Sequence, residues 1–399
     1  MKSLNTLIYS KIRNISHFIK KVVLCYFPDK CSIPCERGKQ IYSVIDSDQK
    51  LTFVFSHGLG GGAEKFLKDK ISNGEILSSE LIMVYPMPDN YGYYMEMDSN
   101  GDNRRFYFPF AGSLMKCIGR AVNSEIIVNN LFGFFGVFTV LDNIVRIKHS
   151  NKALLSMYLH DYYCICDNVH LYDKRNGRYC GLNKCYRCDI TGTDIKKWRG
   201  KWHSFLKQCD RIVAFSEDTK ERVQSVYDGL EIAVQPHKPE PLRKAYVQNS
   251  GKKTIKIGIL GALSDLKGAG IINELISIID EKTVNLELLL IGYSGEFISK
   301  EINKNCYSEY GEFNREQLPD IIEKEGVDAI FIPSVVPETF SYTTQEAIMM
   351  GMPLFCFDIG AQAEQVKQYE KGIVIKEISA DCALKTIYDQ MIERYDSIP

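Results

Sequence analysis

The chain has 399 residues, of which 45% are hydrophobic and 25% charged, and its formal net charge at pH 7 is -1. This length favours two domains, and this composition is typical of a globular protein with sizeable cores. The near-neutral balance gives no support to nucleic-acid binding, which usually shows a basic surface. The longest apolar run, residues 131–141, is too short to span a bilayer.

The N-terminal segment, residues 1–35, has the pattern of an amphipathic helix followed by a linker. Apolar residues recur at helical spacing from Ile8 to Val23, and basic residues such as Lys21 occupy the other face. Such a helix suits the surface of an anionic membrane, which residues 1–27 would contact. The alternative is that the apolar stripe packs on the protein body or on a partner while the lysines are solvated.

Residues 36–243 have the pattern of a first αβ domain. A short apolar strand at residues 51–56 leads into a glycine-rich turn that contains Gly61 and Gly62 and then into a helix start. Glycines in such a turn let the backbone approach a ligand closely, or only let strand and helix meet. Further strands are expected at residues 81–85, 106–110 (in an insertion), 125–128, 154–159 and 211–215.

Four cysteines in an insertion at residues 164–190 have ligand-like spacing for tetrahedral zinc. They are Cys166, Cys180, Cys185 and Cys188. Four thiolates would leave no open coordination position, so we expect a structural zinc and not a catalytic one. The alternative is a set of reduced, partly buried cysteines. Because the chain has thirteen cysteines and no evident secretory signal, we expect a cytoplasmic protein.

A proline-rich stretch at residues 236–241 precedes a second αβ pattern, expected to form a domain over residues 244–380. Its strands are expected at residues 255–260, 286–291, 329–332 and 353–357. The fold class is therefore α/β, with two Rossmann-like, doubly wound domains facing a central cleft that holds the ligand. A last helix, within residues 381–399, is expected to pack back on the first domain.

The most informative segment follows the expected strand at residues 329–332. Glu338 and Glu346 bracket seven residues rich in hydroxyl groups, and a short helical pattern follows. Backbone N–H groups at such a helix start can hold an anion, and the carboxylates can accept hydrogen bonds from sugar hydroxyls. This combination suits a nucleotide-sugar. The alternative is structural, because Thr343 and Glu346 also have the spacing of a capping box.

Short motifs occur in a fixed order along the chain, and together they resemble glycosyltransferase family 4, retaining enzymes of the GT-B fold. In the second half they are Gly261, Lys267-Gly268, Gly292, Tyr310-Gly311, Pro333-Ser334, Glu338, Glu346-Ala347, Gly351, Pro353, Gly360 and Glu364. In the first half they are residues 61–64, 160–162, 211–216 and 236–237.

The resemblance implies three catalytic residues. Lys267 would neutralise the departing phosphate, and His160 would lie beside the reacting carbon of the donor sugar. Glu338 would hold hydroxyls of that sugar. With Lys267 and helix dipoles supplying positive charge, no cofactor would be required for catalysis.

The resemblance also implies a set of donor contacts. Glu346 would hold the ribose hydroxyls of the nucleotide, and backbone N–H groups from Phe340 to Thr343 would receive the diphosphate. The expected donor-binding residues are Gly61, Gly62, Gly261, Lys267, Glu338, Phe340, Ser341, Tyr342, Thr343 and Glu346.

The function implied is transfer of a sugar, with retention of configuration, from a nucleotide-sugar to a glycan or lipid-linked glycan acceptor. The motifs look like those of bacterial enzymes that build surface polysaccharides, such as lipopolysaccharide O-antigens or capsules, and that work at the inner face of the cell membrane. One alternative is a GT-B epimerase or phosphorylase. The other is a non-catalytic partner subunit, favoured by Ala262 standing where many members have an arginine.

Overall fold

The computed structural model describes residues 15–76, 81–99, 101–182, 185, 191–247, 254–299 and 305–396. The chain divides into two compact units. The first comprises Met1–Ile165, Lys196–Ala214 and Val226–Ala233, and the second comprises Cys166–Ile195, Phe215–Ser225 and Val234–Pro399. The cysteine-rich segment, expected in the first domain, therefore groups with the second unit. The reason is that Tyr172 packs against Val335 and Val336.

The first unit is built on a mostly parallel sheet whose nine strands have the order β1-β5-β4-β3-β2-β6-β7-β10-β11. In chain order they are β1 (Glu36–Arg37), β2 (Leu51–Phe55), β3 (Leu81–Pro86), β4 (Tyr93–Ser99), β5 (Asp102–Phe108), β6 (Ser124–Val128), β7 (Leu154–Tyr158), β10 (Arg211–Ala214) and β11 (Ala233–Val234). Its helices include α2 (Tyr42–Ile45), α3 (Gly62–Ser72), α4 (Ala111–Ile118), α5 (Val137–Asn151) and α6 (Ile195–Leu206). Strands β2, β3, β6, β7 and β10 run parallel, as the spacing of strands and helices predicted.

The expected insertion around residues 106–110 is part of the main sheet. Strand β5 pairs antiparallel with β4, and β4 pairs antiparallel with β3. The pattern of β4 was missed because charged Glu96 interrupts it. In the structure Arg105 Nε donates to Glu96 Oε2 at 2.6 Å across the β4–β5 pair, so the carboxylate is neutralised in place.

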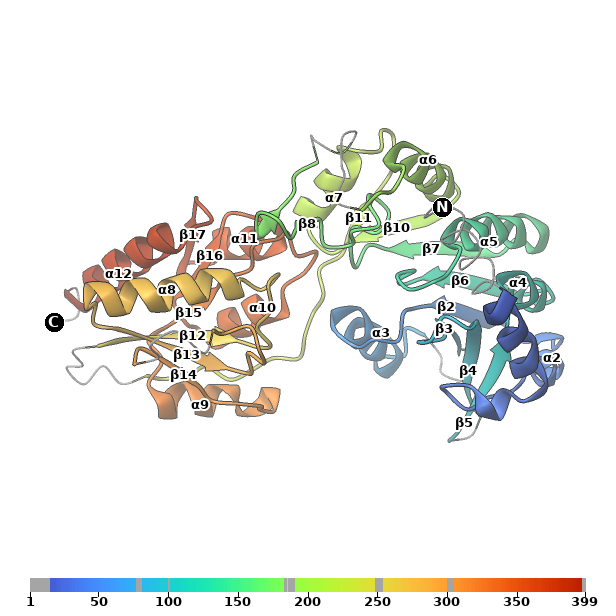
Figure 1. Ribbon diagram of the computed structural model, residues 1–399, viewed down its shortest axis with the longest axis horizontal. Helices are drawn as coiled ribbons and strands as arrows, with labels where there is room; N and C mark the ends of the chain where they lie inside the picture. The colour runs from blue at the N-terminus through green and yellow to red at the C-terminus, as the bar shows by residue number, and fades with distance from the viewer. Residues whose placement is uncertain are drawn as a thin grey trace, which may run out of the picture. The chain divides into compact units, whose positions relative to one another are not determined.

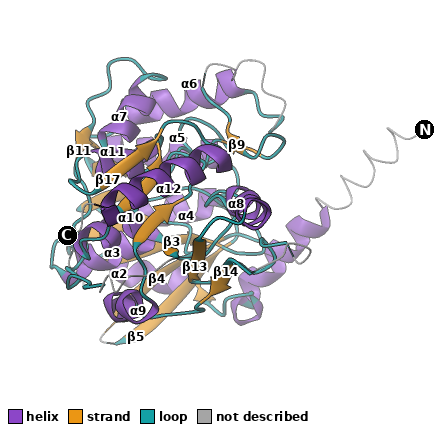
Figure 2. Cartoon of the chain, turned by 90° about the vertical axis from the view of Figure 1, so that its left-hand side faces the viewer, coloured by secondary structure: helices purple, strands orange, loops and turns teal. Residues whose placement is uncertain are grey.

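Residues 15–26 form the first described helix (Figure 2), and its apolar stripe does not pack on the protein body as the alternative expectation had it. Lys21, expected to be solvated, is buried, and its ammonium lies 5.3 Å from the ring centroid of Phe135. The Phe18 ring stacks on Phe110. Aromatic rings of the first unit therefore contact the face of the helix that carries Phe18 and Lys21, and the apolar stripe remains exposed. Ile19 and Val23 of that stripe are 55% and 48% exposed.

The second unit is built on a parallel six-stranded sheet with the order β14-β13-β12-β15-β16-β17. Its strands are β12 (Ile255–Leu260), β13 (Leu286–Ile291), β14 (Tyr307–Glu309), β15 (Ala329–Ile332), β16 (Leu354–Phe357) and β17 (Gly372–Ile375). Its helices include α7 (Glu217–Gln224), α8 (Ala269–Lys282), α9 (Leu318–Glu325), α10 (Tyr342–Met349), α11 (Gly360–Lys367) and α12 (Ala380–Asp396). A small hairpin, β8 (Tyr172–Asp173) with β9 (Arg178–Tyr179), also belongs to this unit.

Both faces of this sheet are covered, which is why β15 and β16 are apolar throughout and β12 and β13 carry only one charged residue each, Lys256 and Glu287. One core includes residues of α8 and α12, and the other includes residues of α9, α10 and α11. Figure 1 shows α8 and α12 side by side, with α9 across the sheet. The last helix was expected to pack on the first domain. Instead Ala383, Ile387 and Met391 belong to the core of the second unit.

Candidate active site

The strand order of the second unit places a topological switch point at the carboxyl ends of two central strands, β12 and β15. From β12 the chain proceeds to β13 and β14 on one side, while β15, β16 and β17 follow on the other. At such a switch point neighbouring loops leave in opposite directions, and ligands bind between them. The two loops here begin at Gly261, after β12, and at Pro333, after β15.

Lys267 and Glu338, one from each loop, form an ion pair at this switch point. Lys267 Nζ lies 2.6 Å from Glu338 Oε1, to which the Ser334 hydroxyl also donates at 2.5 Å. The Glu338 side chain is 11% exposed, whereas that of Lys267 is 43% exposed. The carboxylate is therefore held in one orientation, and the ammonium stays accessible to an anion.

Gly268 explains how the two loops come so close. It has a φ of +80° at the start of α8, a conformation that suits glycine. A Cβ atom there would lie 2.1 Å from the carbonyl oxygen of Pro333, which is far inside van der Waals contact. Any side chain at residue 268 would push Lys267 away from the loop that carries Glu338.

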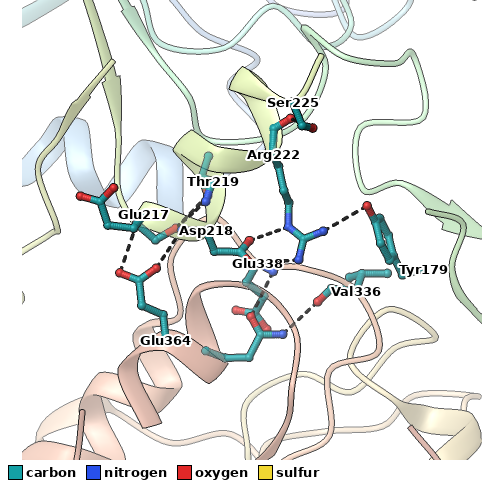
Figure 3. A network of polar contacts seen from close by, with 11 residues as sticks. Tyr179, Glu217, Asp218, Thr219, Arg222, Ser225, Val336, Glu338 and Glu364 are labelled. Carbon is teal, nitrogen blue, oxygen red and sulfur yellow. Dashed lines mark hydrogen bonds and ion pairs between the residues drawn. The ribbon is translucent and has the colours of Figure 1, made fainter. Parts of the chain in front are cut away.

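Helix α11 fixes the backbone around Glu338. The Glu338 N–H donates to Gln362 Oε1 at 3.1 Å, and the Gln362 amide donates to the Val336 carbonyl at 2.9 Å. Ala361 N–H donates to the Glu338 carbonyl at 2.9 Å. Figure 3 shows this region together with Glu364. The Glu364 carboxylate accepts hydrogen bonds from the N–H groups of Glu217 and Asp218 at the start of α7. These hydrogen bonds from α11 thus fix the conformation of the loop after β15 without a ligand.

The start of α10 supplies donors for an anion. Its N-cap is Ser341, whose side chain makes no cap hydrogen bond, and the first backbone bond within the helix runs from Gln345 to Ser341. The N–H groups of Tyr342 and Thr343 thus precede the helical bonding pattern and lie at the positive end of the dipole. A Cβ atom on Gly261 would lie 3.7 Å from the Thr343 side chain, so both loops meet here.

Glu346 has a partner that the sequence did not reveal. Arg315 Nε donates to Glu346 Oε1 at 2.9 Å, and both side chains are less than one-fifth exposed. Because the N-cap is Ser341 and not Thr343, the structure does not show the capping box considered above. Arg315 lies in the segment that follows β14 at the carboxyl edge of the sheet. Its position shortly after the Tyr310-Gly311 motif is the sequence signal that could have indicated a role in the site.

The side chains of Phe340 and Tyr342 take part in an aromatic cluster around His237. The Phe340 ring stacks on His237 with a centroid distance of 4.5 Å, and the Tyr342 hydroxyl lies 2.7 Å from His237 Nδ1. Phe215 packs edge-on against the same imidazole. The expected role of residues 340–343 in donor binding therefore falls on their backbone N–H groups.

His160 lies in the first unit, two residues after the end of β7, and is oriented by Asn129, which follows β6. His160 Nε2 is 2.8 Å from Asn129 Oδ1. The Asn129 amide nitrogen donates to the Ala63 carbonyl at 3.2 Å, which fixes the oxygen toward the imidazole. Nε2 therefore carries a proton, and His160 presents a defined tautomer. Asn129 was missed, although it directly follows an expected strand.

The glycine-rich turn lies at the same edge of the first unit's sheet. Gly61 has a φ of +83° and is the N-cap of α3, and Gly62 is the first residue of that helix. Asn129 connects the turn to His160, since it also bonds to the backbone of Ala63 in α3. The first unit thus brings Gly61, Gly62 and His160 to one sheet edge.

The carboxyl group of Asp161, next to His160, is a weaker acid than that of an ordinary aspartate. Desolvation raises the pKa of its carboxyl group to about 6. Hydrogen bonds from Tyr163 N–H at 2.8 Å and from the Asn130 amide at 2.5 Å oppose this rise. Asp161 therefore titrates close to neutral pH.

The four cysteines expected to bind zinc are only partly described. Cys188 lies outside the described residues, Cys166 and Cys185 are buried, and Cys180 is partly buried. Burial is the largest cause that raises the pKa of Cys166 to about 12, and nearby Cys185 adds to it. Within the described ranges no three His, Cys, Asp or Glu side chains are grouped as metal ligands. The zinc site stays a prediction.

Known proteins resemble this chain in a family motif and in fold. Residues 243–394 match a family model described as glycosyl transferases group 1. No curated protein sequence matches the chain. Among solved structures, sucrose-phosphate synthase from Thermosynechococcus elongatus has 12% identity and a TM-score of 0.57, over 86% of this chain and 90% of that one.

Two further structures are similar at the same level. HepE from Anabaena, in complex with UDP, has 14% identity and a TM-score of 0.53, over 86% of this chain and 90% of that one. A lipopolysaccharide outer core galactosyltransferase has 14% identity and a TM-score of 0.50, over 78% and 81%. The chain therefore has the α/β fold of the GT-B glycosyltransferases, and its residues 243–394 match glycosyl transferases group 1.

Proposed function

We propose that the protein is a retaining glycosyltransferase that moves a sugar from a nucleotide-sugar to a glycan or lipid-linked glycan acceptor. The observation that carries the proposal is the pairing of Lys267 with Glu338 beside the start of α10. A cation and a helix N-terminus suit a diphosphate, and a braced carboxylate suits sugar hydroxyls. The match to glycosyl transferases group 1 and the shared fold support a glycosyltransferase.

The residues suggest how the reaction proceeds. The bond between the anomeric carbon and the diphosphate breaks, and the acceptor oxygen bonds to the same face of that carbon. The acceptor's proton passes to an oxygen of the leaving diphosphate. Lys267 and the N–H groups of Tyr342 and Thr343 stabilise the charge that develops on that group. His160, as an Nε2–H tautomer bonded to Asn129, is suited to accept a hydrogen bond at Nδ1 from a hydroxyl of the sugar near the reacting carbon.

A direct test is turnover of a nucleotide-sugar panel with and without glycan acceptors, followed by the anomeric configuration of the product. Retained configuration in an acceptor-dependent product supports the proposal. Turnover that needs no acceptor and yields an isomerised nucleotide-sugar would indicate an epimerase, and turnover with inorganic phosphate a phosphorylase. Absence of any reaction together with absence of nucleotide binding would indicate the non-catalytic subunit.

The acceptor side of the proposal places the enzyme on an anionic membrane, where lipid-linked glycans of bacterial surface polysaccharides are built. Residues 1–30 contain six basic residues and one acidic residue. Ile15, Ile19 and Val23 form an exposed stripe on the helix at residues 15–26. Apolar side chains and basic charge together suit an anionic bilayer surface. No described helix is both long and apolar enough to cross a bilayer.

Sedimentation with lipid vesicles tests this placement. Wild-type protein should sediment with vesicles that contain phosphatidylglycerol and not with pure phosphatidylcholine. The double variant Ile19→Asp/Val23→Asp should stay in the supernatant, whereas Val122→Asp, at a residue that is 77% exposed, should behave as wild type. Equal sedimentation of all three proteins would contradict a role for the helix.

A structural zinc also belongs to the proposal. Cys166, Cys180 and Cys185 are thiols of one short segment of the second unit, and the sequence places Cys188 close behind them. Thiolates are the ligands that structural zinc prefers. Metal analysis of the purified protein should find one zinc per chain, and a metal-free protein with intact folding would exclude the site.

A further inference from the structure

A tight turn before the β8–β9 hairpin presents His170 to solvent. Leu171 N–H donates to the Asn168 carbonyl at 2.9 Å, and the Asn168 amide donates to the Tyr172 carbonyl at 2.7 Å. Leu171 has a φ of +53°, a left-handed conformation that is strained for a large side chain. Val169 and Leu171 are buried, whereas His170 between them is exposed. These hydrogen bonds and the two buried side chains fix the conformation of the turn. Between them the exposed side chain is the imidazole of His170.

The hairpin that follows this turn docks on both loops of the candidate site. Tyr179 N–H donates to the Val335 carbonyl at 3.1 Å, and Val335 N–H donates to the Leu266 carbonyl at 3.1 Å. Leu266 directly precedes Lys267, and Val335 lies three positions before Glu338. Figure 3 shows Tyr179 beside this loop. The hairpin is therefore fixed against the same two loops that form the ion pair.

A hydrophobic contact adds to these backbone bonds. Tyr172 packs with Val335 and Val336, and Leu266 lies against the same cluster. His170 stands two positions before Tyr172, so its backbone is held by a packed anchor on one side and by the tight turn on the other. The backbone that carries His170 is therefore held beside the two loops that bear Lys267 and Glu338.

The electrostatics of His170 show which charges surround it. Although part of the His170 side chain is exposed, desolvation by the protein around the rest of it is the largest cause that lowers its pKa. The Lys267 ammonium lowers the pKa further, and the Glu338 carboxylate opposes the shift. Both charges of the site therefore act on this imidazole, which is neutral at pH 7. A neutral imidazole donates one hydrogen bond and accepts another, which matches a hydroxyl group. A phosphate would instead favour a cation.

We propose that His170 is a residue of the donor site that hydrogen-bonds a hydroxyl of the transferred sugar and contributes to the choice of sugar. The proposal deepens the function proposed above and rests on it. In this arrangement Lys267 binds the diphosphate, whereas His170 and Glu338 bind hydroxyl groups of the sugar.

The test compares binding of a nucleotide-sugar with binding of the corresponding nucleoside diphosphate by calorimetry, at pH 7.5. His170→Ala should weaken nucleotide-sugar binding about three- to tenfold, the effect of one neutral hydrogen bond. The same variant should bind the nucleoside diphosphate as wild type does. His170→Gln, which keeps a neutral amide, should recover part of the loss, whereas His170→Lys should not. Lys174→Ala, an exposed residue of the same hairpin, is the matched control.

The outcomes separate this inference from the proposed function. If wild type binds a nucleotide-sugar and His170→Ala binds it equally well, the inference alone is overturned. If the variant loses the nucleoside diphosphate to the same extent, or if His170→Lys restores binding, the imidazole acts on phosphate and the inference is again wrong. If wild type binds neither ligand, the proposed function fails first. Circular dichroism of each variant checks that folding is unchanged.

Discussion

Lys267 Nζ and Glu338 Oε1 are 2.6 Å apart, although the two residues are 71 positions apart in the sequence. They come together because β12 and β15 are neighbours and their loops diverge from adjacent strand ends. The pair places one positive and one negative group at the same switch point of the sheet. A ligand with an anionic end and a hydroxyl-rich end can use both.

Loss of Lys267 should therefore reduce sugar transfer more than it reduces donor binding. With Lys267→Met we expect kcat to fall about 100-fold or more, because charge grows on the leaving diphosphate only as the reaction proceeds. Steady-state transfer kinetics measure this effect. Lys282→Met, which removes an exposed lysine from α8, should leave kcat unchanged. Equal kcat in both variants would show that Lys267 does not act on the leaving group.

Arg315 should stabilise the second unit through Glu346. Arg315→Met would leave a mostly buried carboxylate without this partner, so we expect unfolding to become easier by about 2–4 kcal/mol. Thermal denaturation measures the change, and the double variant Arg315→Met/Glu346→Met should recover most of it. Arg243→Met, at an exposed pair with Glu323, serves as the control and should have a small effect. Equal melting temperatures for the two single variants would contradict the buried pair.

Asn129 should act on catalysis through His160. Asn129→Leu removes the acceptor of the Nε2 proton and frees the imidazole to turn, so we expect kcat to fall about 10- to 100-fold with a smaller change in KM. Asn129→Gln should be intermediate, since it keeps the amide on a longer side chain. His149→Leu, on the exposed end of α5, should have wild-type kinetics. If Asn129→Leu retained full kcat, His160 would not need this orientation.

Asp161 should make stability depend on pH between about 4 and 6. Its folded-state pKa of about 6 lies above the ordinary value, so in this range the folded chain binds more protons than the unfolded chain. Stability from this group is present below the unfolded pKa and is lost as pH rises through the folded pKa. Denaturant titrations of wild type and Asp161→Asn should therefore diverge in favour of the variant as pH rises from 4 to 7. A difference that is constant with pH would show that Asp161 titrates normally.

Much of the fold was predictable because strand periodicity and glycine turns are local signals. The strand around Phe331 is fully apolar, and those around Phe53 and Ile257 are mostly apolar, as expected for parallel sheets covered on both faces. Strand β4 was missed because Glu96 breaks its pattern, and its neutralising partner Arg105 is visible only once β4 and β5 pair. Local patterns do not show pairing across strands.

The same limit applies to the site. Lys267 and Glu338 could be found because each stands in a short motif beside a strand end. Arg315, Asn129 and His170 stand in no such motif, and their roles depend on which loops the sheet order brings together. The position of α12 was wrongly expected for a similar reason. Its apolar stripe indicates that it packs, and only the structure shows that α8 is its partner.

Backbone hydrogen exchange tests the central claim most directly, because it locates the bound donor. On addition of a nucleotide-sugar or its nucleoside diphosphate, the amides of residues 339–346 and 261–268 should exchange more slowly. Glu338→Gln should keep the protection given by the nucleoside diphosphate and lose part of the extra protection given by the sugar. Protection confined to other segments, or no change with any nucleotide or nucleotide-sugar, would contradict a donor site at the loops after β12 and β15.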